Sequence, residues 1–303
     1  MSRDDALTQA LSLPALDWRA EQLQSALQGL CPGLVAQARG LTGSTNADLL
    51  DLGRLGDVRP RVLVAEAQSA GRGRMGRQWH SVPGASLTFS IGLPLRPRQG
   101  WGSLSLVVGH AVAETLQPWS RGVPPSGQGR LLIKWPNDLW WYSAEPRSED
   151  EWAAGRKVAG ILIETLPMPA ELGDEGRRWV VIGVGLNVDA QALQVGSPRD
   201  PPVAATSEWW GPRSLPDWWH ALVPPVLGAV LDFERSGAGP RLDGIRQRDL
   251  LAGRSVLLSG GPLRQAQCLG IDADGALRVR AEGQEQRVMA GEVSIRPRGA
   301  GLT

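Results

Sequence analysis

One segment, residues 179–188, restricts the possible fold more than any other part of the chain. Its sequence, WVVIGVGLNV, is rich in β-branched residues and predicts a buried β-strand whose side chains alternate between a bulky and a bare face. The bulky face carries Ile182, Val184 and Leu186, and the bare face carries Gly183, Gly185 and Asn187. A glycine inside a strand weakens it and often marks the close approach of a ligand or another backbone. The bare face is therefore either the floor of a small-molecule site or a surface packed against a neighbouring helix.

The composition is that of a globular protein with room for one large domain and one small one. Hydrophobic residues make up 42% of the 303 residues and charged residues 21%, which is ordinary for a chain with a substantial core. The net charge of +1, from 32 basic and 31 acidic residues, lacks the basic excess typical of nucleic-acid binders. No nucleic-acid partner is therefore expected.

Cysteine usage and hydropathy indicate where the protein works. The two cysteines, Cys31 and Cys268, and the three histidines show no spacing typical of a disulfide framework or a metal site, so we expect a reducing, cytoplasmic setting. The charged N-terminal residues 1–18 do not resemble a signal peptide. No stretch approaches the roughly 18 apolar residues that cross a bilayer, so no membrane association is expected.

The remaining pattern predicts three parts. Residues 1–40 are expected to form a helical lead-in, residues 41–250 the main domain, and residues 251–303 a small all-β barrel with glycine turns such as Gly260-Gly261. Helices are predicted at residues 45–52, 103–116 and 216–235. Strands are predicted at residues 61–67, 86–93, 131–134, 139–142, 158–164 and 179–188. Thr45 and Asp48 have the spacing of a capping box, which makes Thr45 the expected N-cap of the first helix.

The segment Gly71–Arg77, GRGRMGR, follows a predicted strand and contains three glycines and three arginines. It includes a G-x-G-x-x-G pattern, but a dinucleotide-binding fold needs a helix directly afterwards, whereas this segment leads into another strand. Backbone N–H groups of glycines approach anions closely, and guanidinium groups match phosphate or carboxylate oxygens. The segment is therefore an anion-binding loop, a solvated arginine-rich loop or a weak RNA-binding patch.

Two lysines lie at the ends of predicted strands. Lys157 precedes the apolar strand 158–164, and Lys134 begins the segment KWPND. Each lysine either extends into solvent or provides a fixed positive charge inside a cleft. The proline of KWPND ends the preceding strand, so Asn137 and Asp138 lie on a turn from which they can point inward.

Together these segments resemble the biotin–protein ligase family. The match comprises GSTN (residues 43–46), AEAQSAGRGRMGRQW (65–79), KWPNDLWW (134–141), RKVAGILIE (156–164), VVIGVGLNV (180–188) and, near the end of the chain, GEVSIR (291–296). No single segment suffices, but the combination is highly specific. The resemblance implies an α+β fold: a mixed-sheet catalytic domain of the class II synthetase and biotin ligase type, followed by a small C-terminal SH3-like β-barrel.

The resemblance also implies a two-step reaction and assigns residues to it. The carboxylate of biotin attacks the α-phosphate of ATP, with Mg²⁺ on the phosphates, and a lysine of a biotin carboxyl carrier protein then attacks the resulting biotinyl-5′-AMP. The residues implied in catalysis are Lys157, Arg74 and Arg77. Those implied in biotin binding are Ser44, Thr45, Asn46, Gln68, Gly71, Arg72, Gly73, Arg74, Lys157, Gly160, Gly183 and Gly185. Those implied in nucleotide binding are Arg74, Trp79, Asn137, Asp138, Lys157, Asn187 and Arg296, with Glu292 as a weaker candidate.

Partners and alternatives follow from the same resemblance. The expected carrier is the acetyl-CoA carboxylase subunit, and the ligase is expected to be a monomer or a weak homodimer. Only about forty residues precede the matched region, so the DNA-binding domain of the family's repressors is not expected. The nearest alternative is a lipoate or octanoate ligase, which shares the fold and the reaction. A nucleic-acid-binding regulator is supported only by the arginines.

Overall fold

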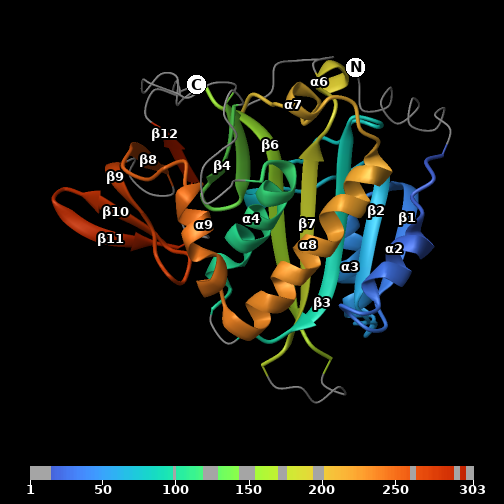
Figure 1. Cartoon of the computed structure of the whole chain (residues 1–303). Helices are drawn as coiled ribbons and strands as arrows, with labels where there is room; N and C mark the ends of the chain where they lie inside the picture. The colour runs from blue at the N-terminus through green and yellow to red at the C-terminus, as the bar shows by residue number, and fades with distance from the viewer. Residues whose placement is uncertain are drawn as a thin grey trace. The chain divides into compact units, whose positions relative to one another are not determined.

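The computed structural model describes residues 15–97, 100–118, 129–142, 154–169, 176–193, 201–259, 264–289 and 294–297. Contacts divide the chain into two units: Met1–Arg96 with Ala159–Gly228, and Pro97–Val158 with Ala229–Thr303. Strand β6 (Arg156–Pro167) begins in the second unit and continues in the first (Figure 1). The predicted turn at Gly260-Gly261 lies outside the described residues.

The first unit is built on a mixed sheet with the strand order β1-β2-β3-β7-β6. Strands β1 and β2 are parallel, and the other neighbours are antiparallel. The bounds of these strands, besides β6, are β1 (Val35–Thr42), β2 (Arg61–Gln68), β3 (Ser86–Leu95) and β7 (Arg178–Asn187). The mixed sheet is therefore confirmed, together with the strands predicted at residues 61–67, 86–93, 158–164 and 179–188.

Helices lie on both faces of this sheet (Figure 1). Helix α3 (Thr45–Arg54) packs on the face of β7 that carries Trp179 and Val181, with which its leucines form one buried cluster. The bulky side chains on the other face of β7 are almost completely buried. Helix α8 (Leu215–Ser236) is drawn in front of β7 in Figure 1. The remaining elements of this unit are α2 (Ala20–Leu27), the 3-10 turn η1 (Arg74–Gly76), α6 (Ala190–Leu193) and α7 (Ser207–Trp210).

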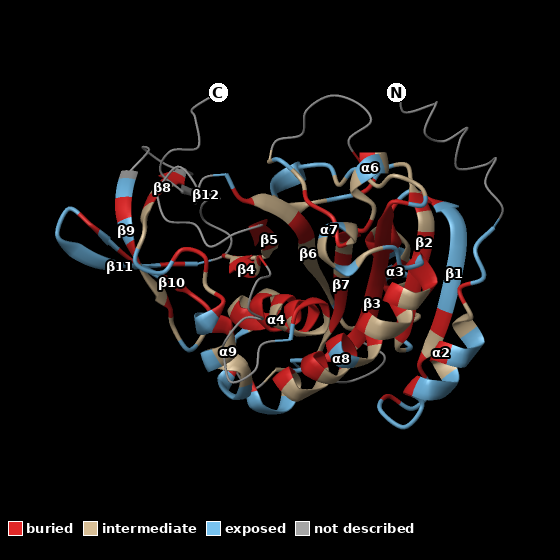
Figure 2. Ribbon diagram, turned by 45° about the horizontal axis from the view of Figure 1, so that its top comes forward, coloured by how far each residue is buried: buried red, intermediate tan, exposed pale blue. Residues whose placement is uncertain are grey.

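Burial follows the position of each strand in the sheet (Figure 2). Strands β3 and β7 are buried along most of their length, whereas five consecutive residues of the edge strand β1 are exposed. Side chains of β3 and β7 therefore meet other protein groups on both faces. At such positions a missing side chain creates room that a neighbour fills.

The second unit contains a hairpin, several helices and a separate sheet. The hairpin is β4 (Arg130–Lys134) with β5 (Asp138–Tyr142), and the helical elements are η2 (Trp101–Ser103), α4 (Leu104–Leu116), η4 (Gly239–Arg241) and α9 (Leu242–Gln247). The sheet is antiparallel, with the order β11-β10-β9-β8-β12. Its strands are β8 (Ser255–Ser259), β9 (Arg264–Ile271), β10 (Leu277–Ala281), β11 (Gln284–Val288) and β12 (Ser294–Pro297). The predicted small β domain is present, while its closure into a barrel and the boundaries at residues 41 and 251 stay predictions.

The helical lead-in predicted over residues 1–40 is wrong over residues 35–40, which belong to a strand. Within the described residues the helix α2 ends at Leu27, and residues 35–42 form the edge strand β1. This segment has no regular alternation of apolar and polar residues. Its strand conformation follows from backbone hydrogen bonding to β2, which a local pattern does not reveal.

The expected N-cap of α3 is wrong by one residue. Ser44 precedes the helix in an extended conformation, and its hydroxyl accepts the backbone N–H of Ala47 at 3.5 Å. Asp48, the other half of the expected capping box, instead accepts hydrogen bonds from Arg39 and Thr42. The side chain of Thr45 consequently points to the sheet instead of capping the helix.

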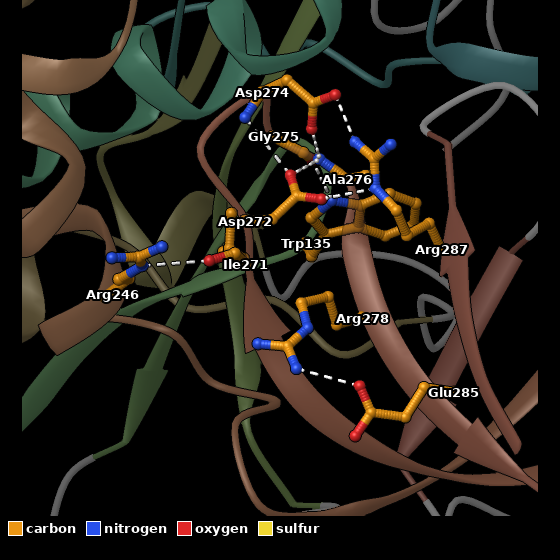
Figure 3. A network of polar contacts seen from close by, with 10 residues as sticks. All are labelled: Trp135, Arg246, Ile271, Asp272, Asp274, Gly275, Ala276, Arg278, Glu285 and Arg287. Atoms are coloured by element: carbon orange, nitrogen blue, oxygen red, sulfur yellow. Dashed lines mark hydrogen bonds and ion pairs between the residues drawn. The ribbon is translucent and has the colours of Figure 1, made fainter.

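The turn between β9 and β10 is fixed by a polar network within the second unit (Figure 3). Asp272 accepts the backbone N–H of Asp274 at 3.2 Å, and Arg287 forms ion pairs with both carboxylates. The indole N–H of Trp135 donates to the carbonyl of Gly275 at 3.0 Å, across 140 residues of sequence. Trp135 is fully buried, so water does not compete for this hydrogen bond.

Only glycine fits at position 275. Its φ is +88°, and a Cβ there would lie 2.5 Å from the Cα of Ser103. Gly283, in the turn between β10 and β11, has a φ of +78°, but a Cβ there would have nothing within 4 Å. Both positions have a left-handed backbone conformation, but only position 275 lacks the room for a side chain.

We expect Gly283→Ala to lower the free energy of unfolding by about 1–2 kcal/mol, because only left-handed strain is introduced. Gly275→Ala should cost roughly 1–3 kcal/mol more, because its methyl group also displaces η2. Urea unfolding of the two variants measures the difference. Equal losses would show that the turn does not pack against Ser103.

Asp249 is an isolated carboxylate in the segment that leads from α9 to the small sheet. Its Oδ1 accepts the backbone N–H of Leu251 at 2.9 Å, while its Oδ2 is buried and has no hydrogen-bond partner among the described residues. Burial is the main cause that raises the pKa of Asp249 to about 6. The folded state therefore favours the protonated carboxyl group more than the unfolded chain does.

This raised pKa predicts a pH-dependent stability with a definite sign. The unfolded side chain ionises near pH 4 and the folded one near pH 6, so the folded state binds more protons between these values and stability falls as pH rises. Relative to wild type, Asp249→Asn should gain on the order of 2–3 kcal/mol of unfolding free energy between pH 4 and pH 7. Unfolding curves measured over this range test the expectation, and a pH-independent difference would contradict it.

Candidate active site

Strands β3, β7 and β6 bring small residues into register. Gly183 lies opposite Ser90 of β3, and Gly185 lies between Thr88 of β3 and Gly160 of β6. Directly opposed residues of antiparallel strands point to the same face. Three of the five glycines predicted to bind biotin, Gly160, Gly183 and Gly185, therefore share one face, which is the face covered by α3 farther along β7.

Two of these glycines make room for side chains of the protein itself. A Cβ at Gly183 would overlap the side-chain amide of Asn46, and a Cβ at Gly185 would lie 2.5 Å from Cζ2 of Trp79. Asn46 belongs to α3, so close packing against a helix applies at Gly183. At Gly185 the bare face meets the ring of Trp79, which was predicted to bind nucleotide.

Polar side chains gather where α3 begins. The backbone N–H of Thr45 donates to Oε1 of Gln68 at 2.8 Å, and the hydroxyl of Thr45 lies 2.7 Å from Oγ of Ser90. Ser90 donates to Oδ1 of Asn46 at 2.6 Å. Ser44, Thr45 and Asn46 are each 3% exposed, and Ser90 is fully buried. Thr45 and Asn46, two of the predicted biotin-binding residues of this segment, therefore meet at the hydroxyl group of Ser90, which the sequence reasoning did not select.

A carboxylate completes this cluster. Glu164 of β6 accepts a hydrogen bond from Nδ2 of Asn46 at 2.9 Å, and the two residues are 118 positions apart. The sequence contains a signal for Ser90, because hydroxyl residues alternate at positions 86, 88 and 90 of an otherwise apolar strand. Glu164 carries no such signal, since a glutamate at the end of an apolar strand is ordinarily a solvated side chain.

The loop of glycines and arginines is closed on itself. An isolated β-bridge joins Arg72 to Gln78, the N–H of Gly73 donates to the carbonyl of Arg77 at 2.7 Å, and the N–H of Trp79 donates to Gly71 at 3.0 Å. A Cβ at Gly71 would overlap the carbonyl oxygen of Trp79, which explains the glycine. The loop leads into β3 and opens no helix, as the sequence predicted.

The arginine side chains of this loop lie at the surface. Arg72 and Arg77 are exposed, and Arg74 is half-buried in the 3-10 turn η1. At the tip, Met75 has a φ of 56° and is 63% exposed. Thr45, Gln68 and the base of the loop thus belong to one unit, with Trp79 holding the loop against β7.

The second unit contains the other predicted cations and polar turn residues. Lys134 and Asp138 close the β4–β5 hairpin, and Oδ1 of Asp138 lies 2.8 Å from Nζ of Lys157. The side chains of Asp138 and Lys157 are 17% and 20% exposed, so this ion pair is largely shielded from water. Lys134 instead lies over the ring of Trp140, 5.3 Å from its centroid. The structure thus pairs Lys157 with Asp138.

The other predicted nucleotide-binding residues are placed as follows. Asn137 is half-buried in the hairpin turn, and Asn187 ends β7 and is 2% exposed. The backbone of Arg296 lies in β12, opposite Leu257. Glu292 falls outside the described residues. The roles assigned to all of them stay predictions.

Two features are absent from the described residues. The part of the chain that the structure describes contains no group of three or more His, Cys, Asp or Glu side chains placed to hold a metal ion. Among the same residues, every helix is too short or too polar to span a bilayer.

Two family models match the chain. Residues 44–187 match the biotin/lipoate A/B protein ligase family, and residues 255–296 match the biotin protein ligase C-terminal domain. The first match begins at the N-cap of α3 and ends with β7, so it contains the whole cluster around Ser90. The second match covers the small antiparallel sheet.

Two curated relatives are named biotin–[acetyl-CoA-carboxylase] ligase. One, from Mycobacterium tuberculosis, is 42% identical over 150 residues, which are 48% of this chain and 47% of the relative. The other, from Paracoccus denitrificans, is 30% identical over 260 residues, which are 83% of this chain and 97% of the relative. The match spans about half the length of the first relative and almost all of the second.

A solved structure supports the fold. The biotin protein ligase from Aquifex aeolicus in complex with biotin and ATP superposes with a TM-score of 0.64 at 24% identity, covering 88% of this chain and 99% of that chain. At this identity the likeness concerns the fold alone. It confirms the predicted α+β class.

The contact between Gly185 and Trp79 should hold the glycine-arginine loop closed. We expect Gly185→Ala to displace the ring and to raise the rate of limited trypsin cleavage after the loop arginines several-fold, because loops with fewer buried contacts open more often. Trp79→Ala should have the same effect. Since both changes remove one contact, the double variant should be cleaved no faster than Trp79→Ala alone. Additive effects would show that the two residues act separately.

Proposed function

The chain belongs to the biotin/lipoate A/B protein ligase family, and we propose that it is an ATP-dependent biotin–protein ligase. It forms biotinyl-5′-AMP from biotin and ATP and then transfers biotin to a lysine of a biotin carboxyl carrier protein. The observation that carries this proposal is the arrangement in the first unit. There, Thr45, Gln68 and the glycine-arginine loop are held beside the bare face of β7. The names of the two curated relatives support the choice of biotin.

In the first step two anions must meet. A carboxylate oxygen of biotin attacks the α-phosphorus of ATP, the bond to the oxygen that bridges to the β-phosphate breaks, and pyrophosphate leaves with that electron pair. Negative charge builds up on the phosphoryl oxygens, so fixed cations lower the barrier. We assign this role to Arg74, Arg77 and Lys157. The guanidinium groups suit the phosphates, and the compact ammonium suits a single oxygen.

Asp138 has a defined part in this arrangement. Its carboxylate lies 2.8 Å from the ammonium of Lys157, so it restricts where that charge can lie. We assign Asp138 to orienting Lys157 in preference to binding a metal ion. Mg²⁺ is proposed as the partner of the ATP phosphates, where it would neutralise part of their negative charge.

In the second step the neutral ε-amine of the carrier lysine attacks the carbonyl carbon of biotinyl-5′-AMP. The carbon–oxygen bond to AMP breaks, AMP leaves with the electron pair, and the nitrogen loses a proton as the amide forms. Water competes for the same anhydride, so the intermediate needs cover. We assign this cover to the loop of residues 71–79, which Trp79 holds against Gly185.

The setting of the enzyme is part of the proposal. We propose a cytoplasmic protein that acts as a monomer or weak homodimer, does not bind nucleic acid, and modifies the carrier subunit of acetyl-CoA carboxylase. The balanced net charge supports the absence of a nucleic-acid partner. Cys31 and Cys268 are both buried thiols, which supports a reducing compartment.

ATP–pyrophosphate exchange tests the proposal without knowledge of the carrier. Purified protein with Mg²⁺ should exchange label only when biotin is present, and Lys157→Ala should lower this exchange about a hundred- to a thousandfold. Arg54→Ala removes an exposed positive charge elsewhere and should exchange like wild type. Exchange with lipoate alone would move the protein to the lipoate ligases. Exchange with neither acid would overturn the proposal.

A further inference from the structure

We propose that Glu164, Asn46 and Ser90 form a hydrogen-bond chain that fixes the direction of the Thr45 hydroxyl. The chain turns Thr45 into an acceptor and makes the site select a ligand that offers an N–H donor there. The three residues are positioning residues, because they act on the ligand through Thr45. The inference rests on the proposed function, since it takes biotin as the ligand.

The chain begins with the orientation of Asn46. Its Nδ2 lies 2.9 Å from a carboxylate oxygen of Glu164 and 3.5 Å from the carbonyl oxygen of Leu162. Both atoms accept hydrogen bonds only, so the reversed amide would place Oδ1 against two acceptors. The amide is therefore held with Nδ2 towards β6 and Oδ1 towards Ser90. Gly183 permits this, because a Cβ there would overlap Oδ1.

The orientation of Asn46 decides which hydrogen bond Ser90 donates. Its Oγ lies 2.6 Å from Oδ1 of Asn46, and a carbonyl oxygen cannot donate, so the serine hydroxyl is the donor. A hydroxyl has a single proton, and this contact uses it. The remaining contact of Ser90, at 2.7 Å from the hydroxyl of Thr45, must then have Thr45 as its donor. Ser90 is fully buried, so no bulk water offers an alternative partner.

The hydroxyl of Thr45 is thus left with lone pairs only. Oε1 of Gln68 lies 3.2 Å from it and is a second acceptor for its proton, besides accepting the backbone N–H of Thr45 at 2.8 Å. The contact with Ser90 is shorter, and because Ser90 gives its own proton to Asn46, this contact needs the proton of Thr45. The same bond to the backbone of Thr45 turns Nε2 of Gln68 outward, near Gly71. The cluster therefore presents an acceptor at Thr45 and a donor at Gln68.

This polarity matches a cyclic urea. The ureido ring of biotin places N–H donors beside a carbonyl acceptor, whereas the dithiolane ring of lipoate has no N–H group. A ligand without a donor leaves the Thr45 oxygen buried and unpaired, which costs about 1–3 kcal/mol. Sites built around such a hydrogen bond reject analogues that lack it far more strongly than apolar pockets do. The hydrogen-bond chain thus determines which ligands are accepted. Glu164, where it begins, acts on the ligand only through the other members of the chain.

The test exchanges a donor for an acceptor in the ligand. The probes are the two carbamate analogues of biotin in which one or the other ring N–H is replaced by oxygen. Selectivity is the ratio of kcat/KM for biotin to that for each analogue in ATP–pyrophosphate exchange. In wild type, one of the two analogues should be strongly disfavoured, because its ring oxygen faces the lone pairs of Thr45.

Two variants should relax this selectivity. Ser90→Ala removes the nearer acceptor of the Thr45 proton and leaves only the longer contact with Gln68, so the hydroxyl turns more easily towards the analogue. Glu164→Leu removes the acceptor that holds Asn46, so the amide can reverse and Ser90 can donate to Thr45. Each should lower the selectivity ratio at least about tenfold, mainly by lowering KM for the disfavoured analogue, while KM for ATP stays within about twofold.

Two control variants distinguish the loss of a fixed hydrogen-bond direction from a general loss of core packing. Glu164→Gln keeps an acceptor at the same place and should retain the wild-type ratio. Thr206→Val removes another fully buried hydroxyl of the same unit, one that donates to Val188 at 3.4 Å, and should also retain it. A change confined to stability would lower activity on biotin and analogue alike and leave the ratio unchanged.

The outcomes distinguish the inference from the proposed function. A wild-type protein that neither binds biotin in calorimetry nor exchanges with it would overturn both. A wild-type protein that is active with biotin, together with Ser90→Ala and Glu164→Leu variants of unchanged ratio, would overturn the chain alone. If Ser90→Ala does not fold, Glu164→Leu decides, because Glu164 is only half-buried and lies at the end of the apolar run of β6.

Discussion

The first unit depends on one constraint: both faces of β7 must be covered. Its own bulky side chains cover one face, and side chains from other segments must cover the other. Ile182, Val184 and Leu186 satisfy the first requirement and are almost completely buried. On the second face Trp179 packs under α3, but Gly183 and Gly185 leave room that Asn46 and a second tryptophan ring occupy. Because protein interiors tolerate few voids, these two absences fix where the start of α3 and the base of the glycine-arginine loop come to rest.

From that packing follows the electrostatic character of the cluster. Once Asn46 is buried against Gly183, its amide must find partners, and Glu164 and Ser90 supply them on opposite sides. A buried polar network is stable only when every member is satisfied, and satisfying this one sets the direction of each hydrogen bond in turn. The polarity presented by Thr45 is thus a consequence of core packing.

The second unit also shields polar groups from water, and it pairs them through an ion pair and a tryptophan hydrogen bond. Asp138 and Lys157 come from different strands and neutralise each other at 2.8 Å, which lets two charged groups remain largely shielded from water. In the small sheet, Gly275 allows the β9–β10 turn to approach η2, and Trp135 of the β4–β5 turn donates to its carbonyl. The hairpin that carries Asp138 is therefore tied to the small sheet through a fully buried indole.

The sequence by itself determined strands β2 to β7, the bare face of β7 and the loop that opens no helix, because alternation and glycine placement are local properties that the backbone expresses directly. It also indicated that the segments from GSTN (residues 43–46) to VVIGVGLNV (180–188) form one family pattern. Only the tertiary structure decided that residues 35–42 form an edge strand, that Ser44 and not Thr45 caps α3, and that Ser90 and Glu164 belong to the cluster. For the edge strand and the cluster, the physical reason is sequence separation: these contacts join residues up to 118 positions apart, and no local pattern records which strand will lie beside which helix. The cap contact of Ser44 with Ala47 is local, but distant hydrogen bonds to Gln68 and Ser90 hold Thr45 away from the capping position.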